Sequence, residues 1–249
     1  MTMPKIGTAE WIQFVRSTPP VRNPLGRSRP TEQFNPYSEA LKRNMGIEGG
    51  NELTGMLLLE ALHAAGLVRW FKEQPFKLNE PEHGIEAIPD FIFEWCNGKR
   101  YVAETKSSAY VTADVLDRTA KLTLVLGKVD IDYLLWTDKI HLRKPLWTNV
   151  RRIWSERGAY YSAEEIEIVI KAISDGPKTL GHLVEHGANS DVALHLAGKG
   201  RAHFNLTEHW TARTIVSDKP EKSYYGLHLG AKHDPEAWWN SLQSLANPE

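Results

Sequence analysis

The chain contains the stretch Ile88-Pro89-Asp90-Phe91, followed by Glu104-Thr105-Lys106, so that Asp90 and Glu104 are fourteen residues apart (104 minus 90). Two carboxylates and a lysine in this order form a PD…ExK pattern. Carboxylate oxygens hold Mg²⁺, the metal stabilises the charge that builds up on a phosphate, and a lysine helps a water molecule to attack. The pattern predicts a metal-dependent nuclease that cleaves phosphodiester bonds. The alternative is an ordinary β-hairpin with an exposed acid and a solvated ion pair.

The register of this hairpin decides whether the side chains can meet. Two β-rich segments flank the turn residues Asn97-Gly98. A two-residue turn there would place Asp90 on the opposite face of the sheet from Glu104. A three-residue loop, for instance Asn97-Gly98-Lys99 with a positive-φ glycine and a bulge, would shift the register by one and bring them to one face. We therefore expect an odd loop, or a break beside Asp90.

The composition is that of a globular protein. The chain has 249 residues, of which 41% are hydrophobic and 24% charged, enough for one large domain or two smaller ones. Lys and Arg number 30 against 31 Asp and Glu, so any affinity for nucleic acid must come from local clusters. The single cysteine, Cys96, excludes an internal disulfide and a multi-cysteine zinc site, and suits a reducing cytoplasm. No apolar run reaches the roughly 18 residues of a membrane span, so no membrane association is expected.

Residues 1–47 predict an extended basic arm. Repeated prolines interrupt any regular element. Basic residues outnumber acids, so the arm could follow a phosphate backbone, with a solvated tail as the alternative. The basic residues are Arg16, Arg22, Arg27, Arg29, Lys42 and Arg43.

A leucine-rich helix is predicted after Gly49-Gly50-Asn51, ending at Gly66. Glu52 lies in its first turn, where a carboxylate suits the helix dipole, and Glu60 lies deeper among leucines. The two are eight residues apart (60 minus 52), a little over two turns, so either could point at a site. A charge at the helix start and a solvated flank are the alternatives.

The following segments predict an α/β core with a mixed sheet. Ala113 to Leu126 is amphipathic and helical, and Ile131 to Trp136 is apolar enough for a buried strand. The segment from Lys139 to Arg157 is the most basic in the chain and contains Trp147 and Trp154. It could lie against DNA, and solvated helix faces are the alternative. Its candidate DNA-binding residues are Arg143, Lys144, Arg151 and Arg152.

A change of composition near Gly158 predicts a small α+β domain over residues 159–218. Three short helices and a hairpin are typical of a winged helix, which binds DNA or proteins. The third helix has few basic groups, which favours a protein partner or weak backbone contact. Residues 219–249 would form a tail with a final helix from Pro235 to Leu245. The expected elements are helices from Ser162 or Ala163 to Ser174, Leu180 to Glu185 and about Ser190 to Ala197, and strands from Ala202 to Leu206 and Arg213 to Val216.

The motifs follow one another in a characteristic order. Glu52 opens the leucine-rich helix, and Glu73-Gln74-Pro75-Phe76, the Asp90 stretch and Val102-Ala103-Glu104-Thr105-Lys106 follow. Segments 136–140 and 145–150 come later. This set resembles the TnsA family of transposon-end endonucleases, in the PD-(D/E)xK superfamily, over about residues 50 to 215. The resemblance implies a restriction-endonuclease-like fold over residues 48–158.

The resemblance assigns the site residue by residue. The helix glutamate of the family falls on Glu52, its aspartate on Asp90, its second ligand on Glu104 and its lysine on Lys106. The three acids would hold Mg²⁺, for which Mn²⁺ can substitute. Gln74 matches a glutamine that braces the site.

Two features depart from the family pattern. Ser107 follows the lysine, where the family usually has proline. The interval from the helix to Gln74 is longer by a few residues, which keeps Glu60 as a rival to Glu52.

The resemblance further implies an endonuclease that cuts the 5′ strand ends of a transposon in the bacterial cytoplasm, at the nucleoid. A separate DDE transposase would cut the 3′ strands, and the C-terminal domain would meet that transposase or an AAA+ regulator. Two other classes share parts of the sequence pattern. A stand-alone restriction, repair or defence nuclease would need no partner, and a non-catalytic DNA-binding adaptor would lack metal dependence.

Overall fold

The computed structural model describes residues 4–22, 32–220 and 243. The chain divides into two compact units. Among the described residues, the first unit comprises 4–22, 32–55, 69–141 and 243, and the second comprises 56–68 and 142–220. The division therefore falls at Leu142 rather than near Gly158, and it also runs through the leucine-rich helix. No helix in the described ranges is long and apolar enough to cross a membrane.

The core of the first unit is a four-stranded sheet with the order β10-β9-β8-β5. β8 and β9 are antiparallel, whereas β9 and β10 are parallel, so the sheet is mixed as the sequence predicts. The parallel pair needs a crossover, which the helix α3 provides. The elements are β5 (Val68–Glu73), β8 (Phe91–Trp95), β9 (Arg100–Lys106), α3 (Ala113–Gly127) and β10 (Ile131–Thr137).

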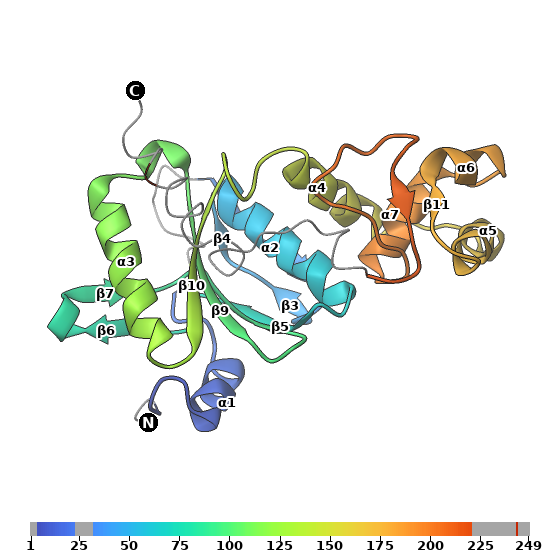
Figure 1. The fold of residues 1–249 in the computed structure, drawn as a ribbon. Helices are drawn as coiled ribbons and strands as arrows, with labels where there is room; N and C mark the ends of the chain where they lie inside the picture. Colours follow the sequence, from blue (N-terminus) through green and yellow to red (C-terminus); the bar gives the residue numbers. More distant parts are fainter. Residues whose placement is uncertain (1–3, 23–31, 221–242, 244–249) are drawn as a thin grey trace. The chain divides into compact units, whose positions relative to one another are not determined.

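α3 covers one face of this sheet, and the first residues of one further helix, which belong to the same unit, lie against the other (Figure 1). The buried side of α3 packs on a cluster that includes Ile92, Val102 and Tyr133. On the other face α2 (Gly50–Ala64) lies so close that a Cβ at Gly55 would be 3.1 Å from the ring of Phe91. The start of α2 is thereby held against the strands that carry the predicted site.

The N-terminal region contains a helix that was not predicted from the sequence. α1 (Ala9–Ser17) buries Trp11, Ile12 and Val15 in the same core cluster as α3. Thr8 caps its start by accepting a hydrogen bond from the Trp11 N–H. The expected extended arm is wrong for this segment, because two helical turns gain their stability from packing rather than from periodicity. Two short pairs follow, β1 (Gln33–Phe34) with β4 (Ile47–Glu48) and β2 (Tyr37–Ser38) with β3 (Arg43–Asn44).

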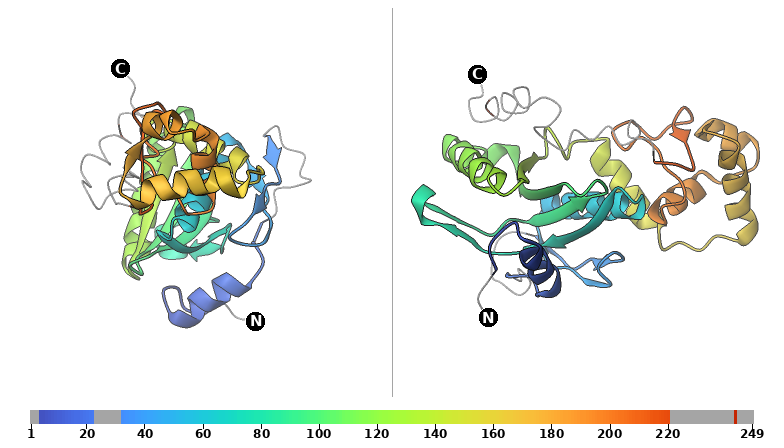
Figure 2. Two further views of the ribbon diagram at one scale, coloured as in Figure 1. Left: turned by 90° about the vertical axis from the view of Figure 1, so that its right-hand side faces the viewer. Right: turned by 60° about the horizontal axis from the view of Figure 1, so that its bottom comes forward.

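A small hairpin joins β5 to β8. β6 (Leu78–Glu80) pairs antiparallel with β7 (Ile85–Ala87) around a 3-10 turn. Its blue-green ribbon extends away from the four-stranded sheet (Figure 2). The base of the hairpin leads into Asp90 and so contributes residues to the site.

The second unit contains the three expected helices. α5 (Ala163–Ser174) starts with a capping box between Ser162 and Glu165, and Thr179 caps α6 (Leu180–Glu185). α7 (Ser190–Gly198) and α4 (Leu146–Glu156) complete the described helices of this unit beyond its share of α2.

The expected hairpin of the second unit takes a different form. β12 (Ile215–Val216) pairs with β11 (Lys178–Thr179), and a single bridge joins His203 to Ser217. The predicted strand from Ala202 to Leu206 is therefore reduced to that bridge. The helix predicted from Pro235 to Leu245 lies outside the described residues, Gln243 excepted.

Candidate active site

The hairpin between β8 and β9 has the odd loop that the sequence predicts. Glu94 pairs with Arg100, and the Trp95 N–H donates to the Lys99 carbonyl at 2.8 Å. The loop is therefore Cys96-Asn97-Gly98, with Gly98 at a φ of 86° that suits glycine. The expectation of an odd loop is confirmed, although the loop starts one residue earlier than Asn97. Continued past Phe91, this register brings Asp90 opposite Glu104.

Asp90 lies just before β8, where the chain is fixed on both sides. Its carbonyl accepts a hydrogen bond from the Gln74 N–H at 2.7 Å. Its Oδ2 accepts from the backbone N–H of Thr105 at 2.7 Å and from the Thr105 hydroxyl at 2.8 Å. Thr105 thus orients the Asp90 carboxylate, a role that was not predicted for the middle residue of the Glu-x-Lys triplet.

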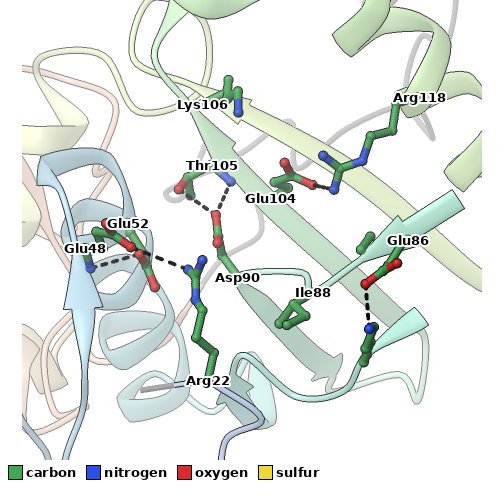
Figure 3. Close-up of a pocket in the computed structure, with 12 residues that line it drawn as sticks. Arg22, Glu48, Glu52, Glu86, Ile88, Asp90, Glu104, Thr105, Lys106 and Arg118 are labelled. Carbon is green, nitrogen blue, oxygen red and sulfur yellow. Dashed lines mark hydrogen bonds and ion pairs between the residues drawn. The ribbon is translucent and has the colours of Figure 1, made fainter. Parts of the chain in front are cut away.

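A cavity of about 490 Å³ brings the predicted residues together (Figure 3). Its lining includes Glu52 from α2, Asp90, and Glu104 and Lys106 from β9. These four positions span 55 residues of sequence (106 minus 52, inclusive) and come from three segments. The cavity also contains acidic and basic side chains outside the predicted set: Arg22, Glu48, Lys77, Glu86 and Arg118.

Glu52 is held from two directions. The Glu48 N–H donates to its Oε2 at 2.9 Å, and Gln74 Nε2 donates to its Oε1 at 3.4 Å. Gln74 is fully buried and has a φ of 41°, a left-handed conformation that is costly for a residue other than glycine. The bracing role expected for Gln74 matches this contact with Glu52.

Glu104 is oriented from the face of the sheet that α3 covers. Its Oε2 accepts from Arg118 Nη2 at 3.1 Å and from the Tyr133 hydroxyl at 2.9 Å. Burial and then the Glu104 charge raise the pKa of Tyr133 well above its usual value, so the hydroxyl remains a donor. Arg118 and Tyr133 were missed in the sequence, because nothing local links them to a residue 14 or 29 positions away.

The carboxylates are packed closely enough to disturb one another. Burial and then the charge of Asp90 raise the pKa of Glu52 to about 8. Burial and then the charge of Glu104 raise the pKa of Asp90 to about 6. The positive charge of Arg22 partly offsets both increases. The cluster therefore favours protons or a cation at neutral pH.

The donor set fits a hard divalent cation. Carboxylate oxygens are the preferred ligands of Mg²⁺, and crowded acids gain from a positive charge between them. Asp90 Oδ1 and Glu104 Oε1 accept no hydrogen bond from the described residues and are available as ligands. The described side chains do not already surround one point, since no group of three His, Cys, Asp or Glu among them is placed to hold an ion. A bound metal would therefore draw these carboxylates together.

Other predicted residues lie away from the cavity lining. Glu60, the rival of Glu52, is 3.7 Å from Arg157 in an ion pair of the second unit. Assigning it to the site is not supported. The candidate DNA-binding residues Arg143, Lys144, Arg151 and Arg152 belong to the second unit, where Lys144 and Arg151 lie over the ring of Trp147 at 5.4 and 4.4 Å.

No protein-family model and no curated protein matches the chain, so the assignments of the site residues rest on the geometry.

Replacing each of the two helix glutamates with glutamine in turn distinguishes their roles. If Glu52 is a metal ligand of a nuclease, as the sequence predicts, Glu52→Gln should lower DNA cleavage by at least about 10-fold, because an amide is a weaker ligand than a carboxylate. Glu60→Gln should leave cleavage within about threefold of the wild type, since Glu60 is not among the residues that line the cavity. Cleavage rates of the two purified variants, checked for folding by circular dichroism, decide the matter. Loss of activity in Glu60→Gln alone would reverse the assignment.

The raised pKa of Glu52 predicts that the stability of the protein without metal falls as the pH rises. Its folded value of about 8 exceeds the ordinary 4.5, so the contribution of Glu52 to stability is full below pH 4.5 and is lost as the pH rises through 8. Glu52→Gln mimics the neutral acid and should raise the melting temperature at pH 8 without metal, with the difference vanishing toward pH 4.5. Glu86→Gln, at a side chain 68% exposed, is the control and should show no such gain. A Glu52→Gln protein that melts below the wild type at pH 8 would contradict this expectation.

Proposed function

We propose that this protein is a Mg²⁺-dependent DNA endonuclease. The proposal rests above all on one observation: Glu52, Asp90, Glu104 and Lys106, which are distant in sequence, line one cavity at the end of a mixed sheet. The odd hairpin loop that places Asp90 opposite Glu104 supports it. The superfamily is PD-(D/E)xK, and the fold of the nuclease unit is restriction-endonuclease-like.

Glu52, Asp90 and Glu104 would hold Mg²⁺, or Mn²⁺ in its place, which when bound stabilises charge on the phosphate and on the leaving 3′ oxygen. Gln74 and Thr105 hold two of these acids in place through the hydrogen bonds described above. Lys106 Nζ orients the attacking water or takes its proton. The water oxygen forms a bond to phosphorus as the bond to the 3′ oxygen breaks, leaving a 5′ phosphate and a 3′ hydroxyl.

The biological setting rests on the resemblance to the TnsA family. The enzyme would cut the 5′ strand ends of a transposon in cut-and-paste transposition, beside a DDE transposase that cuts the 3′ strands. The second unit, a winged-helix-like domain, would contact the transposase or an AAA+ regulator, and the exposed Arg143, Lys144 and Arg152 would contact DNA. The protein would work at the nucleoid of the bacterial cytoplasm.

A cleavage assay distinguishes the functional classes. Labelled transposon-end DNA is incubated with Mg²⁺ or Mn²⁺, with and without a DDE transposase, and the wild type is compared with Asp90→Ala and Lys106→Ala. The proposal predicts partner-dependent cutting that both substitutions remove. Cutting of any DNA without a partner would indicate a stand-alone nuclease. Binding without cutting under every condition would indicate an adaptor.

A further inference from the structure

Four cationic side chains line the cavity, and three of them have a task. Lys77 pairs with Glu86 at 2.5 Å, and Arg118 donates to Glu104. Lys106 is the residue assigned to the attacking water. The fourth is Arg22, which comes from the N-terminal region and enters the cavity beside Glu52 and Asp90 (Figure 3).

The guanidinium of Arg22 has donors to spare. Its contact with Glu48 is loose, with Nη2 3.8 Å from Oε2, which is longer than a hydrogen bond. Its Nε is buried and donates to no group among the described residues. By contrast, Arg43 binds both carboxylate oxygens of Glu73. Since no described residue accepts a hydrogen bond from this guanidinium, its planar fork of N–H groups can match the oxygens of a phosphate.

The segment that carries Arg22 is fixed to the nuclease sheet. The Val21 N–H donates to the carbonyl of Gln74 at 2.9 Å. The buried amine of Lys72 donates to the carbonyls of Val15 and Thr18. Lys72 and Gln74 are two residues apart at the end of β5, and Gln74 itself supports Glu52. Arg22 is therefore held at the cavity before any DNA arrives, which reduces the entropy lost on binding.

We propose that Arg22 binds a backbone phosphate of DNA in this cavity, at or next to the bond that is cut. The inference rests on the proposed nuclease function and adds a substrate-binding residue that belongs to none of the sequence motifs. A simple counter-charge to Glu48 is the competing explanation. A partly exposed ion pair at this distance contributes little, whereas a hydrogen-bonded contact to phosphate would be strong.

Two substitutions and one control test this role. Arg22→Ala should lower the cleavage rate about 10- to 100-fold, the range expected for a charge-assisted hydrogen bond. Arg22→Lys keeps the charge but loses the fork, and should fall between Arg22→Ala and the wild type. Lys5→Ala, which removes an exposed charge of the same N-terminal region, should behave as the wild type. Melting temperatures confirm that each variant is folded.

Binding without turnover supplies the second readout. Affinity for a transposon-end duplex is measured in EDTA over a range of salt concentrations. Loss of one phosphate contact should reduce the slope of log K against log salt by about one in Arg22→Ala only. An unchanged slope would overturn the inference even if cleavage falls, because Arg22 would then act on the fold or the acids alone.

Failure of this inference differs from failure of the proposed function. If the wild type cuts and Arg22→Ala cuts equally well with the same slope, Arg22 is not a phosphate ligand and the nuclease stands. If the wild type never cuts, yet the slope falls in Arg22→Ala, the phosphate contact stands and the nuclease does not.

Discussion

Replacing Asp90 with asparagine should reduce metal-dependent cleavage by more than about 100-fold while the protein stays folded. Substitutions of residues that only orient metal ligands cost roughly 10- to 100-fold, and the loss of a ligand should exceed that. The amide can still accept the hydrogen bonds that Thr105 donates, so the hairpin geometry should persist. Single-turnover cleavage of labelled DNA at saturating protein measures the effect. Cleavage within threefold of the wild type would remove Asp90 from the site.

The same variant should be more stable than the wild type without metal. Burial and the charge of Glu104 raise the pKa of Asp90 to about 6, so ionised Asp90 destabilises the fold increasingly as the pH rises from 3.8 through 6. The neutral amide introduced by Asp90→Asn would carry no such cost at pH 8.

Asp138→Asn provides the contrast. Burial alone would raise the pKa of Asp138, but hydrogen bonds from Ser108 outweigh this effect and lower it. Its charge therefore supports the fold, and Asp138→Asn should lower the melting temperature at pH 8. Thermal denaturation of both variants in EDTA shows whether the melting temperature rises in Asp90→Asn and falls in Asp138→Asn. A loss of stability in Asp90→Asn would contradict the account of buried carboxylates that repel one another.

Removing the amine of Lys106 should reduce the cleavage rate by about 100-fold or more, the usual range for a group that moves or orients a proton. Lys106 ends β9 and lines the cavity beside Glu104. Lys106→Ala should lower the single-turnover rate more than the affinity for DNA, since in the proposed mechanism the amine acts on the water rather than on the duplex.

Lys121→Ala is the matched control, because Lys121 pairs with Asp117 on the exposed side of α3. It should cut within about threefold of the wild type. If Lys106→Ala lost affinity in proportion to rate, Lys106 would be a phosphate contact and the water would need another activator.

The hairpin and its register were predictable because their determinants are local. The alternation of apolar residues identifies the two strands. Whether the loop at Gly98 has an odd or an even number of residues decides whether Asp90 lies on the same face of the sheet as Glu104. The helices that begin after Ser162 and Thr179 were equally predictable, since these two capping residues stand directly before apolar periodic segments.

Helix geometry excludes a single site shared by Glu52 and Glu60 but does not select between them, so the choice needed the three-dimensional structure. Eight residues rotate the side chain by about 80° and move it about 12 Å along the axis, so the two acids cannot reach the same point. Their identical residue type hides this difference when only the sequence pattern is compared.

Other parts could not be derived from the sequence, because tertiary packing alone creates them. α1 is a short helix whose Trp11 packs against Phe76 and whose Val15 lies in the same core cluster, so two turns of sequence alone gave too weak a signal to predict it. Arg118 and Tyr133 converge on Glu104 only when the crossover helix and β10 are in place. Arg22 reaches the cavity only because Lys72 and Gln74 hold its segment.

The most direct test of the central claim is cleavage of end-labelled transposon-end DNA by the wild type and Asp90→Asn, with the partner transposase present, in Mg²⁺ and in EDTA. We expect a cut 5′ strand carrying a 5′ phosphate, formed only by the wild type and only with Mg²⁺. Equal cutting by both proteins, or cutting by the wild type in EDTA, would contradict the claim.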